Sequence, residues 1–98
     1  MVRWTRCGRI IPGKEAQALP WAKELTDWLN KKYGSHLSVY MDCFGELGTV
    51  RWFSDFENLA AVEARLQQLA ADPEFLQRAS QAAALFQTGA FDTVMATL

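Results

Sequence analysis

The sequence has few of the residues that mark a metal site or a disulfide framework. It has one histidine, His36, and two cysteines, Cys7 and Cys43, which are far apart and at no metal-ligand spacing. It also has no glycine-rich phosphate loop and no dinucleotide fingerprint. We therefore expect no metal, no cofactor and no structural disulfide.

Long apolar segments are absent as well. No run approaches the roughly 20 apolar residues that span a bilayer, and the first six residues lack the apolar core of a signal peptide. The charge is balanced, with 10 Lys and Arg against 11 Asp and Glu, interspersed along the chain. This leaves no electrostatic footprint for nucleic acid or an anionic membrane, so we expect neither partner. Two cysteines without motif spacing and the lack of a signal peptide favour a reducing cytoplasm as the compartment.

Apolar and aromatic residues, in contrast, are abundant. Half of the 98 residues are hydrophobic, including four Trp and six Phe, whereas a chain of this length has room for one domain, 1–98, with a small core. Either the core is rich in aromatics, or a second apolar surface is buried in a partner. The second explanation is favoured because large exposed apolar patches are uncommon on monomers.

Periodicity predicts the order β-α-β-β-α-β. A strand over 2–11 ends at Pro12-Gly13, and a helix over 14–33, kinked or restarted at Pro20, ends at Gly34. Two strand-like runs, 35–44 and 49–56, flank a turn at 45–48 and predict a hairpin. A helix over 59–71 is capped by Asn58 and breaks at Asp72-Pro73. A second helical segment begins there and ends at Gly89. A last strand covers 91–98.

A turn at 45–48 fixes the expected register of the hairpin. It places Phe44 opposite Thr49, Asp42 opposite Arg51, and Tyr40 opposite Phe53. Alternation then separates the residues of the hairpin into two faces. One face is nearly all apolar and consists of Leu37, Val39, Met41, Cys43, Val50 and Trp52. The other face mixes aromatic, polar and charged residues and consists of Ser38, Tyr40, Asp42, Phe44, Arg51, Phe53 and Asp55. The apolar face is expected to lie against the helices.

These elements define an α+β fold of the ferredoxin-like type: a four-stranded antiparallel sheet with its helices on one face. Such a sheet leaves its other face open. No chain is left over to cover it, so we expect a homodimer with an isologous contact.

Several segments resemble a known family. These are Trp21-Ala22-Lys23-Glu24 followed by Leu25 and Trp28, Val39-Tyr40 with Phe44-Gly45 and Gly48, Arg51-Trp52-Phe53, and Ala71-Asp72-Pro73-Glu74-Phe75. Together with the element order they are similar to the dimeric α/β-barrel superfamily, and most similar to small NIPSNAP-like bacterial proteins. The resemblance covers nearly the whole length and implies a homodimer whose two sheets form a barrel. Because members include cofactor-free oxygenases, haem-degrading enzymes, isomerases and proteins without known activity, the fold alone does not select a function.

The best polar candidates in the sequence are Asp42 and Arg51. In a structural role they form a cross-strand ion pair that aligns the hairpin or reaches the partner. In a functional role Arg51 holds an anionic group or enolate and Asp42 orients it. Tyr40, Phe44 and Phe53 then form an apolar pocket around an aromatic or acyl ligand. Strand-end and buried positions favour structural roles for His36, Cys7 and Cys43. Trp4 and Arg6 share one face of the first strand, and the sequence does not show which, so Arg6 either joins this pocket or faces solvent.

Two functions of different class follow. The chain is either a structural or ligand-binding homodimer that takes an apolar or aromatic small molecule at the sheet face, or a cofactor-free enzyme of the oxygenase or isomerase type that acts on an aromatic or acyl substrate inside the barrel. The first is favoured, since no catalytic arrangement of residues is evident in the sequence.

Overall fold

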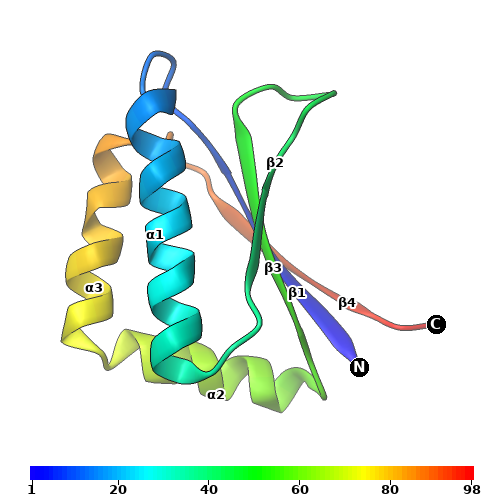
Figure 1. Cartoon of the computed structure of the whole chain (residues 1–98). Coiled ribbons are helices and arrows are strands. Elements are labelled where there is room, and N and C mark those ends of the chain that lie inside the picture. The colour runs from blue at the N-terminus through cyan, green and yellow to red at the C-terminus, as the bar shows by residue number, and fades with distance from the viewer.

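The computed structural model describes all 98 residues and confirms the ferredoxin-like α+β fold. Its four strands are β1 (Val2–Arg9), β2 (Ser38–Met41), β3 (Thr49–Phe56) and β4 (Phe91–Ala96). They form one sheet in the order β2-β3-β1-β4, and every neighbouring pair is antiparallel. The first and last strands of the chain thus lie side by side, and both termini lie at the same end of the sheet (Figure 1).

The helices lie together on one face of this sheet and leave the other face open (Figure 1). They are α1 (Glu15–Tyr33), α2 (Leu59–Ala70) and α3 (Pro73–Ala79), which a 3-10 helix, η1 (Ser80–Ala84), continues. None of them is long and apolar enough to cross a membrane.

Helix α1 is positioned by an apolar stripe with helical spacing. Ala18, Ala22, Leu25 and Leu29 are buried at intervals of three and four residues, which places them on one side of the helix, toward the sheet. Gly34 ends the helix in the left-handed conformation with φ 61°, which costs glycine little. The helix continues through Pro20 as a single element, so the expected restart at that residue is wrong.

The hairpin register differs from the expected one by two residues. Met41 pairs with Val50 and Tyr40 with Arg51, and the connection is longer than the four residues expected. A shift of two preserves the alternation of faces, so the hydrophobic pattern fits both registers equally. The connection contains Gly45 and Gly48, which both adopt positive φ, 88° and 83°, a conformation that costs glycine little.

Two other expectations about elements need correction. Phe44 and Cys43 lie in the exposed loop and not in a strand. The last helical segment ends at Ala84, before Gly89, because the following residues pair with the end of β1: Ile11 N donates to the Leu85 carbonyl (2.9 Å), and Phe86 forms a bridge with Ile10.

The core lies where the inner face of the sheet meets α1 and the segment after η1. Its buried members are Ile10, Ala18, Ala22, Val50, Trp52 and Phe86. Trp52 packs near Phe86, with ring centroids 5.9 Å apart, and edge-on to Trp21 at 6.5 Å. Trp52 also donates from Nε1 to Thr26 Oγ1 at 3.1 Å, so its one polar atom is satisfied in the core.

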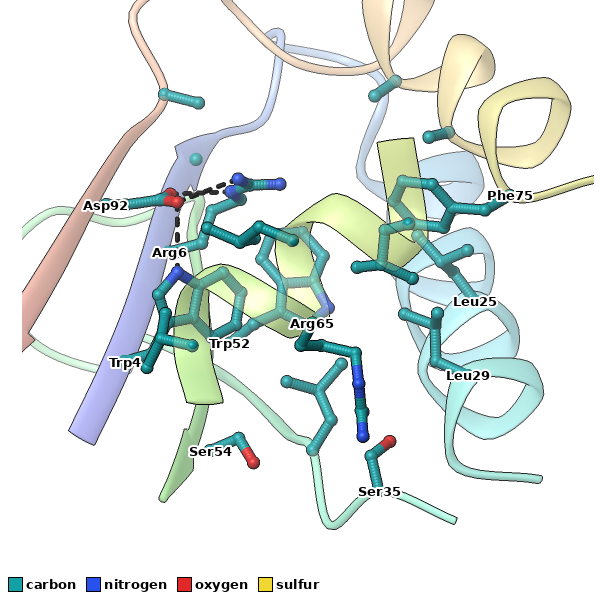
Figure 2. A pocket seen from close by; sticks show the side chains of 18 of the residues that line it. Trp4, Arg6, Leu25, Leu29, Ser35, Trp52, Ser54, Arg65, Phe75 and Asp92 are labelled. Atoms are coloured by element: carbon teal, nitrogen blue, oxygen red, sulfur yellow. Dashed lines mark hydrogen bonds and ion pairs between the residues drawn. The ribbon is translucent and has the colours of Figure 1, made fainter. Parts of the chain in front are cut away.

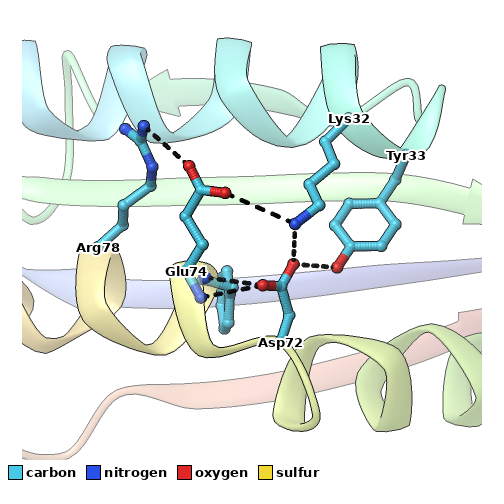
Figure 3. Close-up of polar contacts among 6 residues, drawn as sticks. Lys32, Tyr33, Asp72, Glu74 and Arg78 are labelled. Carbon is cyan, nitrogen blue, oxygen red and sulfur yellow. Dashed lines mark hydrogen bonds and ion pairs between the residues drawn. The ribbon is translucent and has the colours of Figure 1, made fainter.

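The break between α2 and α3 is confirmed, and Asp72 stabilises it. Its buried carboxylate accepts hydrogen bonds from the backbone N of Glu74 (3.0 Å) and Phe75 (3.3 Å), as an N-cap residue does. It also accepts from Lys32 Nζ at 2.7 Å and from the Tyr33 hydroxyl, which both come from the end of α1. Figure 3 shows these side chains converging on one carboxylate. Asp72 therefore joins the ends of three helices.

This cluster gives a pH dependence with a defined sign. The hydrogen bonds from Lys32 and Tyr33 hold the pKa of Asp72 well below its usual value. A carboxylate whose pKa is depressed by folding stabilises the protein above its unfolded-state pKa of about 3.9 and loses that contribution as the pH falls below it. We expect Asp72→Asn to be less stable than the wild type at pH 7, and the difference to shrink toward pH 3.

Urea denaturation of both proteins at several pH values measures this difference. Asp27→Asn is the control, because Asp27 forms only an exposed pair with Lys23 within α1. A difference between Asp72→Asn and the wild type that is the same at pH 7 and pH 3 would contradict the role assigned to the ionised carboxylate.

Candidate functional site

A cavity lies between the inner face of the sheet and the helices. It has a volume of about 490 Å³, and 15 of its 21 lining residues are hydrophobic. This volume and this composition are typical of sites for small organic ligands, which occupy about 300–1,000 Å³. The cavity is therefore the candidate site.

Three of the four tryptophans line the cavity. Trp4 and Trp52 reach it from β1 and β3, and Trp21 reaches it from α1. The aliphatic wall consists mainly of Leu25, Leu29, Leu37, Val62, Leu66 and Leu69. Where Ala79 and Ala82 line the cavity, short side chains leave space that larger ones would fill. At Gly8 the Phe86 ring packs directly against the strand, since a Cβ there would lie 3.2 Å from it. The result is a wide apolar space next to the core, with flat aromatic surfaces suited to stacking.

One polar group in the cavity is the cross-strand pair of Arg6 and Asp92. Arg6 Nε donates to Asp92 Oδ1 at 2.7 Å and Nη2 donates to Oδ2 at 2.8 Å, while Trp4 Nε1 donates to Oδ2 at 3.0 Å. Figure 2 shows these three side chains together at one end of the cavity. The paired strands β1 and β4 position them, because Arg6 lies directly opposite Asp92 in the register.

The charge of this pair is fixed by its geometry. Burial opposes the ionisation of Asp92, but the hydrogen bonds from Arg6 and Trp4 outweigh it and lower the pKa of the carboxyl below its usual value. Asp92 is therefore ionised at neutral pH and neutralises Arg6, whose Nη1 makes no hydrogen bond within the chain. This end of the cavity can donate a hydrogen bond to a ligand while remaining neutral overall.

A second polar group lies on the other side of the cavity. Arg65 of α2, Ser35 and Ser54 line it there, and Figure 2 shows Arg65 and Ser35 well separated from the Arg6–Asp92 pair. Ser35 Oγ donates to Asn30 Oδ1 at 2.8 Å. Arg65 donates from Nε to Gln68 Oε1 at 3.1 Å and lies over the ring of Tyr33 at 5.3 Å.

The residues singled out from the sequence lie on the opposite, outer face of the sheet or in the loop. Tyr40 stacks on Phe53 with centroids 5.2 Å apart. Arg51 donates to Asp42 through Nε at 2.9 Å and Nη2 at 3.1 Å, and this bond lowers the pKa of Asp42. Phe44 is 93% exposed. None of these five residues lines the cavity.

The expected contact between Asp42 and Arg51 therefore exists, although the two residues are not directly opposite. Arg51 faces Tyr40 across the strands, and its side chain reaches along β2 to Asp42. The structural interpretation, an ion pair that aligns the hairpin, is the one this geometry fits. A ligand-binding role of Tyr40, Asp42, Phe44, Arg51 and Phe53 stays a prediction.

Sequence reasoning missed Asp92 and Arg65 as cavity residues and left the face of Arg6 open. A signal for Arg6 was present: Trp4 on β1 and Ile10 just after it share its alternation, and bulky apolar residues at that parity indicate the covered face. Asp92 had no such signal, because only the pairing of the first and last strands brings its side chain to Arg6.

The site and the fold together define a class of protein: a small ferredoxin-like α+β domain with an apolar cavity between its sheet and its helices. The model of the NIPSNAP family matches residues 6–97. The chain belongs to the NIPSNAP family. A comparison with curated proteins finds no match.

Solved structures with the same fold include two NIPSNAP proteins. One is an uncharacterized NIPSNAP domain protein from Burkholderia xenovorans, with a TM-score of 0.85 and 18% identity over 100% of this chain and 95% of that one. The other is a NIPSNAP family protein from Agrobacterium tumefaciens, with a TM-score of 0.84 and 17% identity over 99% and 92%. A putative antibiotic biosynthesis monooxygenase from Deinococcus radiodurans has a TM-score of 0.74 and 17% identity over 100% and 93%. At these identities the likeness concerns the fold alone.

Proposed function

We propose that this protein binds a small apolar or aromatic molecule in the cavity between sheet and helices, and that it does so as a homodimer. The observation that supports binding is the cavity itself. Its volume of about 490 Å³ exceeds the share of one water molecule, about 30 Å³, many times. An apolar space of this size, lined by aromatic and aliphatic side chains, suits a small apolar ligand.

Binding is a better proposal than catalysis because of the titratable groups in the cavity. These are Arg6, Arg65 and Asp92, and Asp92 is ionised, paired and lowered in pKa. A carboxylate with a low pKa is a poor general base, and an arginine is always protonated. The alternative, a cofactor-free oxygenase or isomerase, is compatible with the monooxygenase named among the fold relatives, but no group in the cavity favours it.

Filling the cavity tests the proposal. Ala79 lines the cavity at the end of α3, whereas Ala83 is exposed and does not line it. We expect the neutral dye N-phenyl-1-naphthylamine to bind the wild type at one site per chain with increased fluorescence. Ala79→Phe occupies part of the same volume and should weaken this binding about tenfold or more.

Ala83→Phe is the matched control and should bind the dye as the wild type does. Saturable binding that survives in Ala79→Phe, or no binding to the wild type at all, would overturn the proposed ligand site.

The homodimer is supported by the outer face of the sheet, which no element of the chain covers (Figure 1). The outer face is defined here as Thr5, Tyr40, Phe53, Phe91, Thr93 and Met95. Three of these are large and exposed: Tyr40 by 61%, Phe91 by 59% and Met95 by 49%. Ion pairs flank them, Arg3 with Asp55 and Arg51 with Asp42. An aromatic centre with a polar rim is the usual composition of an interface.

A substitution at the centre of the outer face tests the dimer. Thr5 lies between Phe53 and Thr93 in the sheet. By light scattering we expect the wild type to have a mass of about 22 kDa, twice the 11.1 kDa of one chain. Thr5→Arg places an unpaired charge at the centre of the proposed interface and should shift the mass to 11.1 kDa.

Ala64→Arg, at an exposed position of α2, is the control and should leave the dimer intact. A wild-type mass of one chain across the micromolar range would exclude the dimer.

As to compartment, we propose a reducing cytoplasm, which the two free cysteines, buried Cys7 and exposed Cys43, support.

A further inference from the structure

Among the six arginines, Arg65 is the one without an acidic partner. Arg3, Arg6, Arg9, Arg51 and Arg78 each form an ion pair with a carboxylate. Arg65 has only the neutral Gln68 and the ring of Tyr33 near its guanidinium. Its positive charge is therefore uncompensated by any side chain.

This unpaired charge lies at the wall of the cavity. Arg65 is half-buried and lines the cavity beside the apolar residues Val62, Leu66 and Leu69 of the same helix. Figure 2 shows its side chain extending along the cavity toward the side where Ser35 lies. In surroundings poor in water an ion pair or a charge-assisted hydrogen bond is stronger than on an open surface.

The two arginines of the cavity thus differ in what they can bind. Arg6 is neutralised by two hydrogen bonds to Asp92, so it has little excess charge to offer an anion. Arg65 retains its full charge and several free N–H donors, which suit a planar anion such as a carboxylate. The cavity is lined by two arginines and one aspartate, so its side chains carry one excess positive charge.

We propose that Arg65 binds the anionic end of the ligand, so that the cavity selects an amphipathic monoanion, an aromatic or medium-chain carboxylate, over a neutral molecule of the same shape. This inference rests on the proposed function, because it specifies the ligand class of the same cavity. The apolar body of the ligand would lie against Trp4, Trp21 and Trp52, with its carboxylate toward α2.

Two dyes with the same ring system test this selectivity. 1-Anilinonaphthalene-8-sulfonate has one negative charge, and N-phenyl-1-naphthylamine is its neutral counterpart. We expect Arg65→Gln to weaken binding of the anionic dye by roughly 10- to 100-fold, the usual effect of one charge-assisted hydrogen bond in an apolar site. Binding of the neutral dye should change by less than about threefold, and Arg65→Lys should restore part of the affinity for the anion.

Arg78→Gln is the matched control, since it removes the same charge from the neighbouring helix α3 at a residue that does not line the cavity. Competition of the bound anionic dye by decanoate and decanol extends the test to the proposed ligand class, and decanoate should displace the dye at the lower concentration. Equal losses for both dyes in Arg65→Gln would show that Arg65 only shapes the cavity and would overturn the inference.

An anionic dye that binds Arg65→Gln as it binds the wild type would also overturn it. In both cases the neutral dye still binds the wild type, and the proposed function stands. If neither dye binds the wild type, or if Ala79→Phe binds both as the wild type does, the proposed ligand site fails and this inference fails with it.

Discussion

Replacement of Trp52 with alanine should lower the free energy of unfolding by about 3–5 kcal/mol, as truncation of a large buried aromatic does. Trp52 is 8% exposed, packs against Phe86 and Trp21 and forms part of the cavity wall. For a domain with a total stability of about 5–15 kcal/mol, this loss is a large share. Urea denaturation followed by circular dichroism, at one fixed protein concentration, measures it, because the stability of a dimer depends on concentration.

Trp28→Ala is the matched control for the same residue type. Trp28 is half-buried and lies outside the core and the cavity, where it contacts Tyr33, Lys32 and Arg78. Its loss should cost clearly less than that of Trp52. Equal costs for the two substitutions would contradict the position of the core on the inner face at Trp52.

The second large effect concerns Thr26, which is 4% exposed. Its hydroxyl donates to the Ala22 carbonyl at 2.7 Å and accepts from Trp52 Nε1 at 3.1 Å. Thr26→Val leaves the buried indole N–H without a partner, and the desolvation cost of an unsatisfied donor is about 1–3 kcal/mol. We expect a loss of stability in that range by urea denaturation.

Thr49→Val is the same substitution with the opposite expectation. Thr49 is fully buried, but its Oγ1 has no hydrogen-bond partner, so removing the hydroxyl should be neutral or stabilising.

In a Trp52→Phe background, Thr26→Val should cost less than in the wild type, because no indole N–H is left unsatisfied. Additive costs of Thr26→Val and Trp52→Phe would show that their hydrogen bond contributes no coupling energy.

The fold was largely predictable because its signals are local. The apolar stripe of α1, the Asn58 cap and the Asp72-Pro73 break each follow from a few neighbouring residues, and the structure has all three. The register of the hairpin was not predictable, since a slip of two residues keeps every side chain on its face. The two registers differ only in the residues that face each other, such as Met41 with Val50, and in the length of the connection.

The site was less predictable than the fold. Most of the cavity wall was expected as a core, because Val62, Leu66, Leu69 and Phe75 follow the apolar stripes of their helices. Periodicity shows which residues face inward but not whether they fill the space between the layers. The polar ends of the cavity depend on contacts distant in sequence, such as Arg6 with Asp92, which no local pattern reveals.

The most direct test of ligand binding in the cavity uses the four tryptophans as reporters. In protein labelled with 5-fluorotryptophan, each gives one fluorine resonance, assigned by single Trp→Phe variants. On titration with 1-naphthol, a neutral aromatic, the resonances of the three cavity residues Trp4, Trp21 and Trp52 should shift in a saturable manner, while that of Trp28, which does not line the cavity, should stay in place. A saturable shift of Trp28 alone, or no shift of the other three at any concentration, would contradict ligand binding between the sheet and the helices.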